Sequence, residues 1–305
     1  MVDAVHLSYV HAIVMGLIQG VTELFPVSSL GHGVIVPGLL GWSDLVKPQS
    51  QSESFFLAFL VGLHVGTACG LLVHYRREWV RIIGGFFSSI VHRRMTSPDA
   101  RLAWMLGLAT IPIGIVGLAL EHQLRVLFAK PFAASVFLMC NGVLLLGGEL
   151  LRRRSLLAHR VGASGAPLAV GDRDAPGFRR LESLSMPRAV AIGATQILAL
   201  LAGISRSGVS MVAGISEGLD HEDAARFSFL LATPVIFLAG ILKLPDLTGH
   251  LGDGVRGQTL AAAACAAVTA FLSVKFLVRW FQTRTLWPFG VYCVLAGLAC
   301  TIYFA

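Results

Sequence analysis

Six apolar runs of about 20 residues constrain this chain more than any other feature of its sequence. They cover residues 54–74, 102–121, 131–150, 225–244, 258–278 and 286–304. About 20 apolar residues in a helix cross the hydrocarbon core of a bilayer. Of the 305 residues, 55% are hydrophobic and 13% are charged, whereas soluble domains carry roughly a quarter charged residues. The sequence therefore predicts an all-α polytopic integral membrane protein with six transmembrane helices in a single membrane domain, residues 1–305.

Two further apolar regions are interrupted by polar residues. Residues 8–42 break at Pro26-Val27-Ser28-Ser29, and residues 188–219 break at Gly203-Ile204-Ser205-Arg206-Ser207-Gly208. Each region is long enough for two half-length helices joined by a polar loop. Irregular backbone at membrane depth is tolerated only where protein or a wet cavity surrounds it. We therefore expect two re-entrant helix-loop-helix hairpins.

The two halves of the chain resemble each other. A shift of 177 positions superimposes four identical pairs: Gln19 and Gln196, Ser28 and Ser205, Gly31 and Gly208, Gly41 and Gly218. Each half has a hairpin followed by three spans, so the odd number of crossings makes the second half inverted. We predict repeat one at 8–150, a cytoplasmic loop at 151–187 and repeat two at 188–305. Paired interrupted segments in inverted halves point to a site at their interface.

Arginines in the connecting segments predict the orientation. Sixteen fall on one side of the predicted topology, against five basic residues on the other. Cytoplasmic loops carry the excess of basic residues, so both termini are predicted outside. The sixteen are Arg76, Arg77, Arg81, Arg93, Arg94, Arg101, Arg152, Arg153, Arg154, Arg160, Arg173, Arg179, Arg180, Arg188, Arg279 and Arg284. Because these arginines lie in loops between spans, the net charge of +7 indicates anionic lipid headgroups rather than nucleic acid as the partner.

Glu23 and Arg206 are charged residues well inside apolar segments, one in each hairpin. Ionisable groups at membrane depth are costly and are functional by default. A buried ion pair that only fixes the packing is the simpler alternative. The surrounding polar side chains favour a site, and they are Gln19, Thr22, Ser28, Ser29, His32, Ser205, Ser207 and Ser210.

The chemistry predicted for the loops of the two hairpins together is phosphate recognition. The planar fork of Arg206 matches two phosphate oxygens. The backbone from Gly203 to Gly208, with Ser205, Ser207 and Ser210, supplies hydroxyls and N–H groups at the start of a new helix, which favours anions. These residues are the predicted substrate-binding set, together with Ser28.

Two roles are predicted for the polar residues of the first hairpin. Gln19 and Glu23, spaced four residues apart, lie on one face of a helix and are predicted to hold a divalent cation, Mg²⁺ or Ca²⁺, through oxygen ligands. Ser29 or Ser28 is the candidate nucleophile, and His32 is the candidate proton donor or acceptor.

These motifs resemble those of the undecaprenyl-pyrophosphate phosphatases, the bacitracin-resistance family. The first stretch, from Gln19 to His32, is similar to the Glu/Gln-x-x-x-Glu and Pro-Val-Ser-Ser-x-Gly-His motifs of that family. Residues 202–210 resemble its Pro-Gly-x-Ser-Arg-Ser-x-x-Thr motif, with alanine at 202 and serine at 210. Residues 63–67 and 226–234 are also similar, and the likeness extends from about residue 8 to 304.

The resemblance implies an activity, a location and a set of site residues. The expected reaction removes the terminal phosphate of a polyprenyl diphosphate, typically undecaprenyl, and so recycles the lipid carrier of peptidoglycan synthesis and confers bacitracin resistance. Ser29 and His32 match the hydroxyl and imidazole proposed to be catalytic there, with Glu23 and Arg206 beside them. The resemblance further implies a divalent cation, the bacterial cytoplasmic (inner) membrane and a site open to the extracytoplasmic side. The sequence leaves homo-oligomer formation open.

Two alternatives remain. A second lipid phosphatase family shares a Ser-Gly-His and a Ser-Arg motif, but it needs a histidine six residues after its arginine, where this chain has Val212. A polyprenyl-phosphate transporter or flippase, which would bind a headgroup through Arg206 without hydrolysis, also suits inverted repeats with broken helices.

Overall fold

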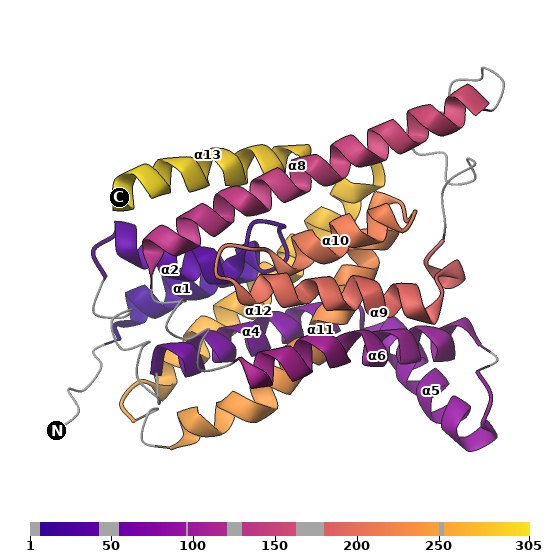
Figure 1. Cartoon of the computed structure of the whole chain (residues 1–305). Helices are drawn as coiled ribbons and strands as arrows, with labels where there is room; N and C mark the ends of the chain where they lie inside the picture. The colour runs from indigo at the N-terminus through magenta and orange to yellow at the C-terminus, as the bar shows by residue number, and fades with distance from the viewer. Residues whose placement is uncertain (1–6, 43–54, 96, 121–129, 163–179, 250–252) are drawn as a thin grey trace.

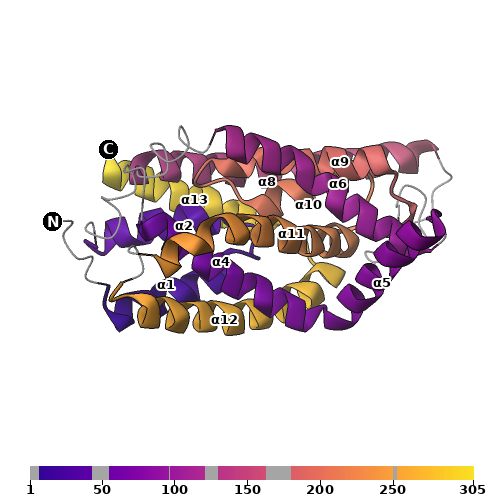
Figure 2. The ribbon, with the colours of Figure 1, turned by 90° about the horizontal axis from the view of Figure 1, so that it is seen from below.

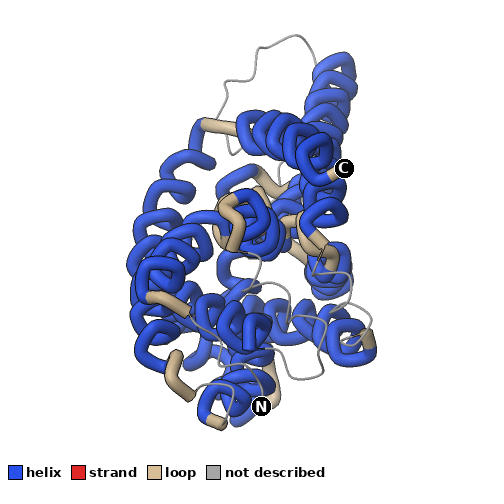
Figure 3. Tube along the Cα trace, turned by 90° about the vertical axis from the view of Figure 1, so that its left-hand side faces the viewer, coloured by secondary structure: helices blue, strands red, loops and turns tan. Residues whose placement is uncertain are grey.

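The computed structural model describes residues 7–42, 55–95, 97–120, 130–162, 180–249 and 253–305. Throughout these ranges the chain forms helices, turns and loops, without a β-strand. Most of the long helices run roughly parallel to one another (Figure 1), and Figure 3 shows them nearly end-on. The first helix begins and the last helix ends at the same end of the bundle.

A helix covers each of the six predicted spans. These helices are α4 (Phe55–His74), α6 (Pro98–Ala119), α8 (Pro131–Gly162), α11 (His221–Thr248), α12 (Arg256–Thr283) and α13 (Trp287–Phe304). Among the described residues, five of them are long and apolar enough to cross a bilayer, and the number is six if α4 and the helix after it count as one bent span. Large apolar side chains such as Ile115 and Leu295 are more than 60% exposed on these helices, as expected where lipid replaces water. The chain is a multi-pass membrane protein.

Shorter helices occupy the two interrupted regions. They are α1 (Tyr9–Thr22), α2 (Ser29–Leu39), α9 (Met186–Thr195), the 3₁₀ helix η3 (Gln196–Leu200) and α10 (Arg206–Ser216). At 1.5 Å rise per residue, a helix of 14 residues is about 21 Å long and is too short to cross the bilayer. The serine before α2 and the serine before α10 each cap their helix in the same way: Ser28 Oγ accepts from Gly31 N, and Ser205 Oγ accepts from Gly208 N. These are two of the pairs related by 177 positions; the inverted relation of the halves and the re-entrant path stay predictions.

Two segments differ from simple loops. Helix α5 (Arg76–His92) follows α4 at an angle of 89° and lies at one end of the bundle (Figure 2). Helix α8 continues to Gly162, so the first part of the predicted loop 151–187 is helical. Leucine, arginine and alanine, which are good helix formers, dominate residues 150–159 and account for this extension. Residues 163–179 of that predicted loop lie outside the described residues.

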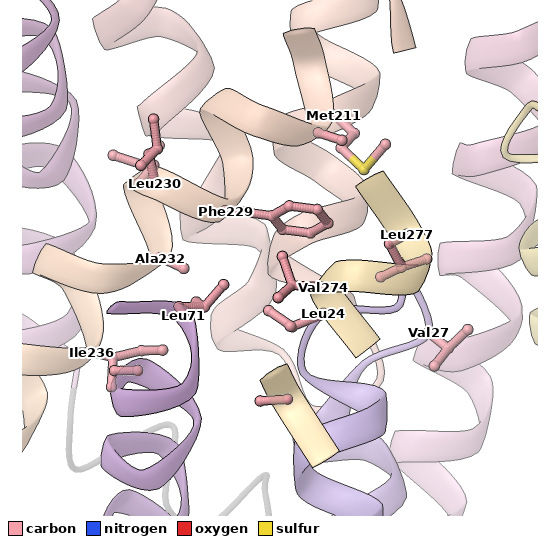
Figure 4. Packing of buried hydrophobic residues seen from close by; sticks show 14 of the residues in the cluster. Leu24, Val27, Leu71, Met211, Phe229, Leu230, Ala232, Ile236, Val274 and Leu277 are labelled. Atoms are coloured by element: carbon pink, nitrogen blue, oxygen red, sulfur yellow. The ribbon is translucent and has the colours of Figure 1, made fainter. Parts of the chain in front are cut away.

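The centre of the bundle is packed with apolar side chains around the first hairpin's turn. Figure 4 shows Leu24 near Val274 of α12 and Phe229 of α11, and each of these side chains is at most 1% exposed. Helix α12 packs against both α1 and α4. The helices approach closely because glycines line the contact. A Cβ added to Gly16 of α1 would lie 2.2 Å from Ala262 O of α12, and one added to Gly66 of α4 would lie 2.3 Å from Ala263 O. Helix α12 thus holds the end of α1 beside the middle of α4.

Candidate active site

The turn between α1 and α2 and the turn between η3 and α10 are in direct contact. Ser28 Oγ accepts hydrogen bonds from Gly31 N in its own helix and from Gly203 N in the other hairpin, both at 3.2 Å. A Cβ added to Gly31 would lie 2.9 Å from Gly203 Cα, so the two backbones touch with no room for a side chain. Ser28 itself adopts φ 69°, in the left-handed region that a non-glycine residue occupies at a cost of about 1–3 kcal/mol. Such strain is typical of functional turns.

Asn141 of α8 joins the same two turns from a third element. Its Nδ2 donates to Pro26 O at 3.0 Å, and its Oδ1 accepts from Ser205 N at 2.9 Å. The side chain is fully buried. A single amide therefore sets the distance between the first and second turn.

A cavity of about 260 Å³ opens beside the paired turns. Its apolar wall comes from α4, α6, α11 and the segment around η3. Its polar end combines a carboxylate, a guanidinium, an imidazole and three hydroxyls. The polar lining residues are Glu23, Ser28, Ser29, His64, Ser205 and Arg206, and the apolar ones are Leu30, Leu60, Val61, Ile113, Ala199, Leu200, Ile204, Val235, Ile236 and Ala239.

The Glu23 carboxylate is the centre of the polar end. Its Oε2 accepts from Gln19 Nε2 at 3.0 Å and from the Ser29 hydroxyl, and it lies 3.1 Å from His64 Nε2. Its Oε1 pairs with Arg206 Nη2 at 2.7 Å. Because Glu23 is only 5% exposed, these partners take the place of water. The carboxylate is positioned to accept the proton of Ser29.

Arg206 has one guanidinium nitrogen to spare. Its Nη2 pairs with Glu23, whereas its Nη1 is buried and has no hydrogen-bond partner in the described part of the chain. Leaving a buried charged donor unsatisfied costs free energy. Because Arg206 lines the cavity, this nitrogen is a candidate donor to an anion bound there.

Two helix N-termini face the same cavity. Helix α2 begins at Ser29 and α10 begins at Arg206, and both residues line the cavity together with the capping residues before them. The first N–H groups of a helix have no partner within the helix, and the helix dipole is positive there. Together with Arg206, the two termini make the polar end of the cavity a favourable place for a phosphate.

The structure divides the residues expected in the site into two groups. Glu23, Ser28, Ser29, Ser205 and Arg206 line the cavity, whereas the others lie behind it. Those behind it support the turns. Gln19 donates to Glu23, and Gly208 N donates to the capping hydroxyl of Ser205. Ser207 Oγ lies 3.0 Å from Ser205 Oγ, and Ser210 Oγ donates to Arg206 O and contacts Ser228.

His32 also lies outside the cavity lining. Its Nδ1 donates to Ser28 O at 2.7 Å, and its Nε2 lies 2.7 Å from the Tyr292 hydroxyl of α13, with the two rings stacked. Both ring nitrogens are therefore engaged. In this arrangement His32 holds the carbonyl of the strained turn residue.

Three site residues were missed from the sequence: His64, Asn141 and Tyr292. The stretch around His64 was among the motifs of the resemblance, but no role was assigned to it. Asn141 is a polar residue in an otherwise apolar span, which was a usable signal. Nothing in the local sequence distinguishes Tyr292 from other aromatic residues near a membrane surface.

The donor set around Glu23 does not fit a metal ion held by the protein alone. Gln19 directs its Nε2, and not a carbonyl oxygen, at Glu23. The remaining partners of the carboxylate are donors as well, and hard divalent cations require several oxygen ligands. Within the described ranges, no group of three or more His, Cys, Asp or Glu side chains could hold a metal.

Comparisons with known proteins agree with the resemblance. A sequence model of the family described as "Bacitracin resistance protein BacA" matches residues 12–299. A protein of Mycolicibacterium paratuberculosis named "Undecaprenyl-diphosphatase" is 54% identical over 303 residues, which is 98% of each chain. "Undecaprenyl-diphosphatase 2" of Frankia alni is 49% identical, again over 98% of each chain, and the protein of the same name from Chromobacterium violaceum is 44% identical over 95% of this chain and 96% of its own.

Proposed function

Because this chain belongs to the bacitracin resistance protein BacA family, we propose that it is an undecaprenyl-diphosphatase. It hydrolyses the terminal phosphate of undecaprenyl or a related polyprenyl diphosphate to give the monophosphate lipid and inorganic phosphate. The names of relatives that are 44–54% identical to this chain support this activity. In the cell the reaction recycles the lipid carrier of cell-wall synthesis and confers bacitracin resistance.

One observation carries the proposal: Arg206, the N-termini of two helices and a serine bonded to a carboxylate all line one cavity with an apolar wall, and Arg206 Nη1 has no hydrogen-bond partner among the described residues. The polar end suits a diphosphate, which is anionic and rich in acceptor oxygens. The apolar wall suits the first isoprene units of the tail. The remainder of the tail stays in the bilayer, where no desolvation of polar groups is needed.

Ser29 is the nucleophile in this proposal and Glu23 is its general base. Ser29 Oγ attacks the terminal phosphorus, its proton passes to Glu23 Oε2, and the bond from that phosphorus to the bridging oxygen breaks. The polyprenyl monophosphate leaves. Water then attacks the phosphoserine, Ser29 Oγ recovers the proton from Glu23, and inorganic phosphate is released. Arg206 Nη1 and the helix N-termini stabilise the charge on the transferred phosphoryl oxygens.

A divalent cation enters this proposal with the substrate. The donor set of the protein does not fit one by itself, so the oxygens of the diphosphate would supply most of its ligands and Glu23 would be the nearest carboxylate. Removal of free Mg²⁺ and Ca²⁺ by a chelator, followed by readdition of each, tests the dependence. Cation binding of similar strength with and without a polyprenyl diphosphate would contradict this arrangement.

We place the protein in the bacterial cytoplasmic membrane with the arginine-rich end inside. Helix α5 and the extension of α8 lie at that end, opposite the end at which α1 begins and α13 ends. With that orientation both termini lie outside, and the site opens to the extracytoplasmic side. Cysteine labelling from either side of sealed vesicles, with single cysteines at Tyr9 and Arg94, tests the orientation. A homo-oligomer is compatible with this arrangement.

Release of phosphate by the purified full chain in detergent tests the reaction. The substrate is undecaprenyl diphosphate, and the control is Arg206→Ala. The wild-type protein should release phosphate at a rate far above that of the control. Equal rates would exclude hydrolysis and favour the transporter alternative, which scrambling of a labelled polyprenyl phosphate in liposomes would then establish. None of the relatives named above is called a transporter.

A further inference from the structure

A second histidine lies where the sequence predicted His32 to act. His64, in the middle of α4, lines the cavity and approaches the carboxylate of Glu23, whereas both ring nitrogens of His32 are used behind the cavity. His64 has no role in the motifs discussed above. Its position raises the question of what this ring does in a phosphatase.

The hydrogen bonds of His64 define its state and its orientation. Nδ1 lies 2.7 Å from Leu60 O, one helical turn earlier, and a carbonyl can only accept, so Nδ1 carries a proton. Nε2 lies 3.1 Å from Glu23 Oε2, the oxygen that also accepts the Ser29 hydroxyl. A hydrogen bond at this second nitrogen to a carboxylate requires a proton there as well. The ring is thus fixed at one end by its own helix and directs its other N–H at Glu23.

The two oxygens of Glu23 are held from different helices. Arg206 of α10 holds Oε1, and His64 of α4 holds Oε2. Gln19 and Ser29 also donate to Oε2, but both belong to the same segment as Glu23. Without His64, Oε2 loses its contact from another helix, and its alignment with Ser29 is held less firmly. The buried side chains and the close packing of α4 on α12 keep His64 at this distance.

We propose that His64 is a positioning residue of the phosphatase: by donating to Glu23 Oε2 it keeps that oxygen aligned with the Ser29 hydroxyl. The proposal rests on the proposed function for its kinetic consequence. The required property is a donor at the position of Nε2. Glutamine, whose amide nitrogen reaches a similar point, should substitute for histidine, and leucine of similar size should not.

Three variants of the full chain test the proposal: His64→Gln, His64→Leu and, as a matched control on the same helix, His74→Leu. His74 packs against Tyr75 and Phe271 outside the cavity. A misaligned catalytic group lowers turnover by about 10²-fold. We therefore expect His64→Leu to lose about that factor in kcat with little change in KM, and His64→Gln and His74→Leu to stay near the wild type. Equal losses in His64→Gln and His64→Leu, or full activity in His64→Leu, would overturn the proposal.

A second readout does not depend on turnover. The infrared carboxylate stretch of Glu23, assigned by its disappearance in Glu23→Gln, should shift in His64→Leu and remain in place in His64→Gln. An unchanged band in His64→Leu contradicts the proposed contact even in a protein that hydrolyses nothing. Absence of phosphate release by the wild type, with the band shift present, would instead contradict the proposed function alone.

Discussion

Arg206 Nη2 lies 2.7 Å from Glu23 Oε1, although the two residues are 183 positions apart and belong to different halves of the chain. The side chain of Glu23 is 4% exposed and that of Arg206 is 12% exposed. A buried ion pair gives little stability by itself, because desolvation offsets the attraction. In the proposed mechanism, Arg206 neutralises the carboxylate that activates Ser29 and keeps a second nitrogen for the phosphate.

Replacement of Arg206 by lysine should separate charge from geometry. Lysine keeps one positive charge near Glu23 but lacks the planar fork that pairs with the carboxylate and the phosphate together. We expect kcat/KM to fall by about 10²-fold with the protein still folded. The control is Arg226→Lys. Arg226 Nη2 lies 2.6 Å from Glu78 Oε1, and neither residue lines the cavity. Wild-type activity in Arg206→Lys would mean that the fork is not used.

The two adjacent serines should respond differently to alanine. Ser29→Ala removes the hydroxyl that is bonded to Glu23 and should abolish phosphate release. Ser28→Ala removes a helix cap and the bond to Gly203 N, so it should lower stability by about 1 kcal/mol and reduce turnover only in part. Phosphate release and thermal unfolding of both variants, together with a search for phosphoserine at 29 by mass spectrometry, distinguish the roles. Trapped phosphate on His32 would assign the nucleophile to the histidine.

Tyr292→Phe tests the place of His32. The substitution removes only the hydroxyl that contacts His32 Nε2 at 2.7 Å. Since His32 lies behind the cavity lining, we expect a loss of stability of about 1 kcal/mol and turnover within a few-fold of the wild type. Tyr303→Phe at an exposed position serves as the control. A loss of turnover as large as that of Ser29→Ala would show that His32 takes part in the chemistry.

Asn141→Leu should uncouple the two turns. The variant loses the bonds to Pro26 O and Ser205 N, which leaves both groups buried without their partner, at a cost of about 1–3 kcal/mol each. Misplacement of Arg206 relative to Ser29 should lower kcat/KM by about 10²-fold. Asn141→Asp keeps the acceptor for Ser205 N but loses the donor to Pro26 O. A smaller loss of kcat/KM in Asn141→Asp than in Asn141→Leu would show that the bond to Ser205 N matters more. Cys140→Ser, at an exposed neighbour, should be neutral.

The sequence by itself determined the spans, the two interrupted segments and the residues at their breaks. Helix-length apolar runs have one solution in a bilayer, because every backbone group must bond within its own helix. Glu23 and Arg206 were identified for the same reason: a charge in an apolar segment is visible without any structure. Helix α8 continues to Gly162, into the segment predicted as a cytoplasmic loop, because arginine and leucine continue a helix well.

Only the tertiary structure decided which groups surround the carboxylate. His64 and Asn141 reach the two turns because α4 and α8 pack against them, and such contacts depend on helix separation, rotation and tilt, which no local pattern records. The Tyr292 hydroxyl of α13 engages His32 Nε2 outside the cavity lining, whereas α4 brings His64 to the lining. The stretch from Gln19 to His32 therefore predicted that a site exists, but the long-range packing of small residues between helices determined which histidine faces Glu23.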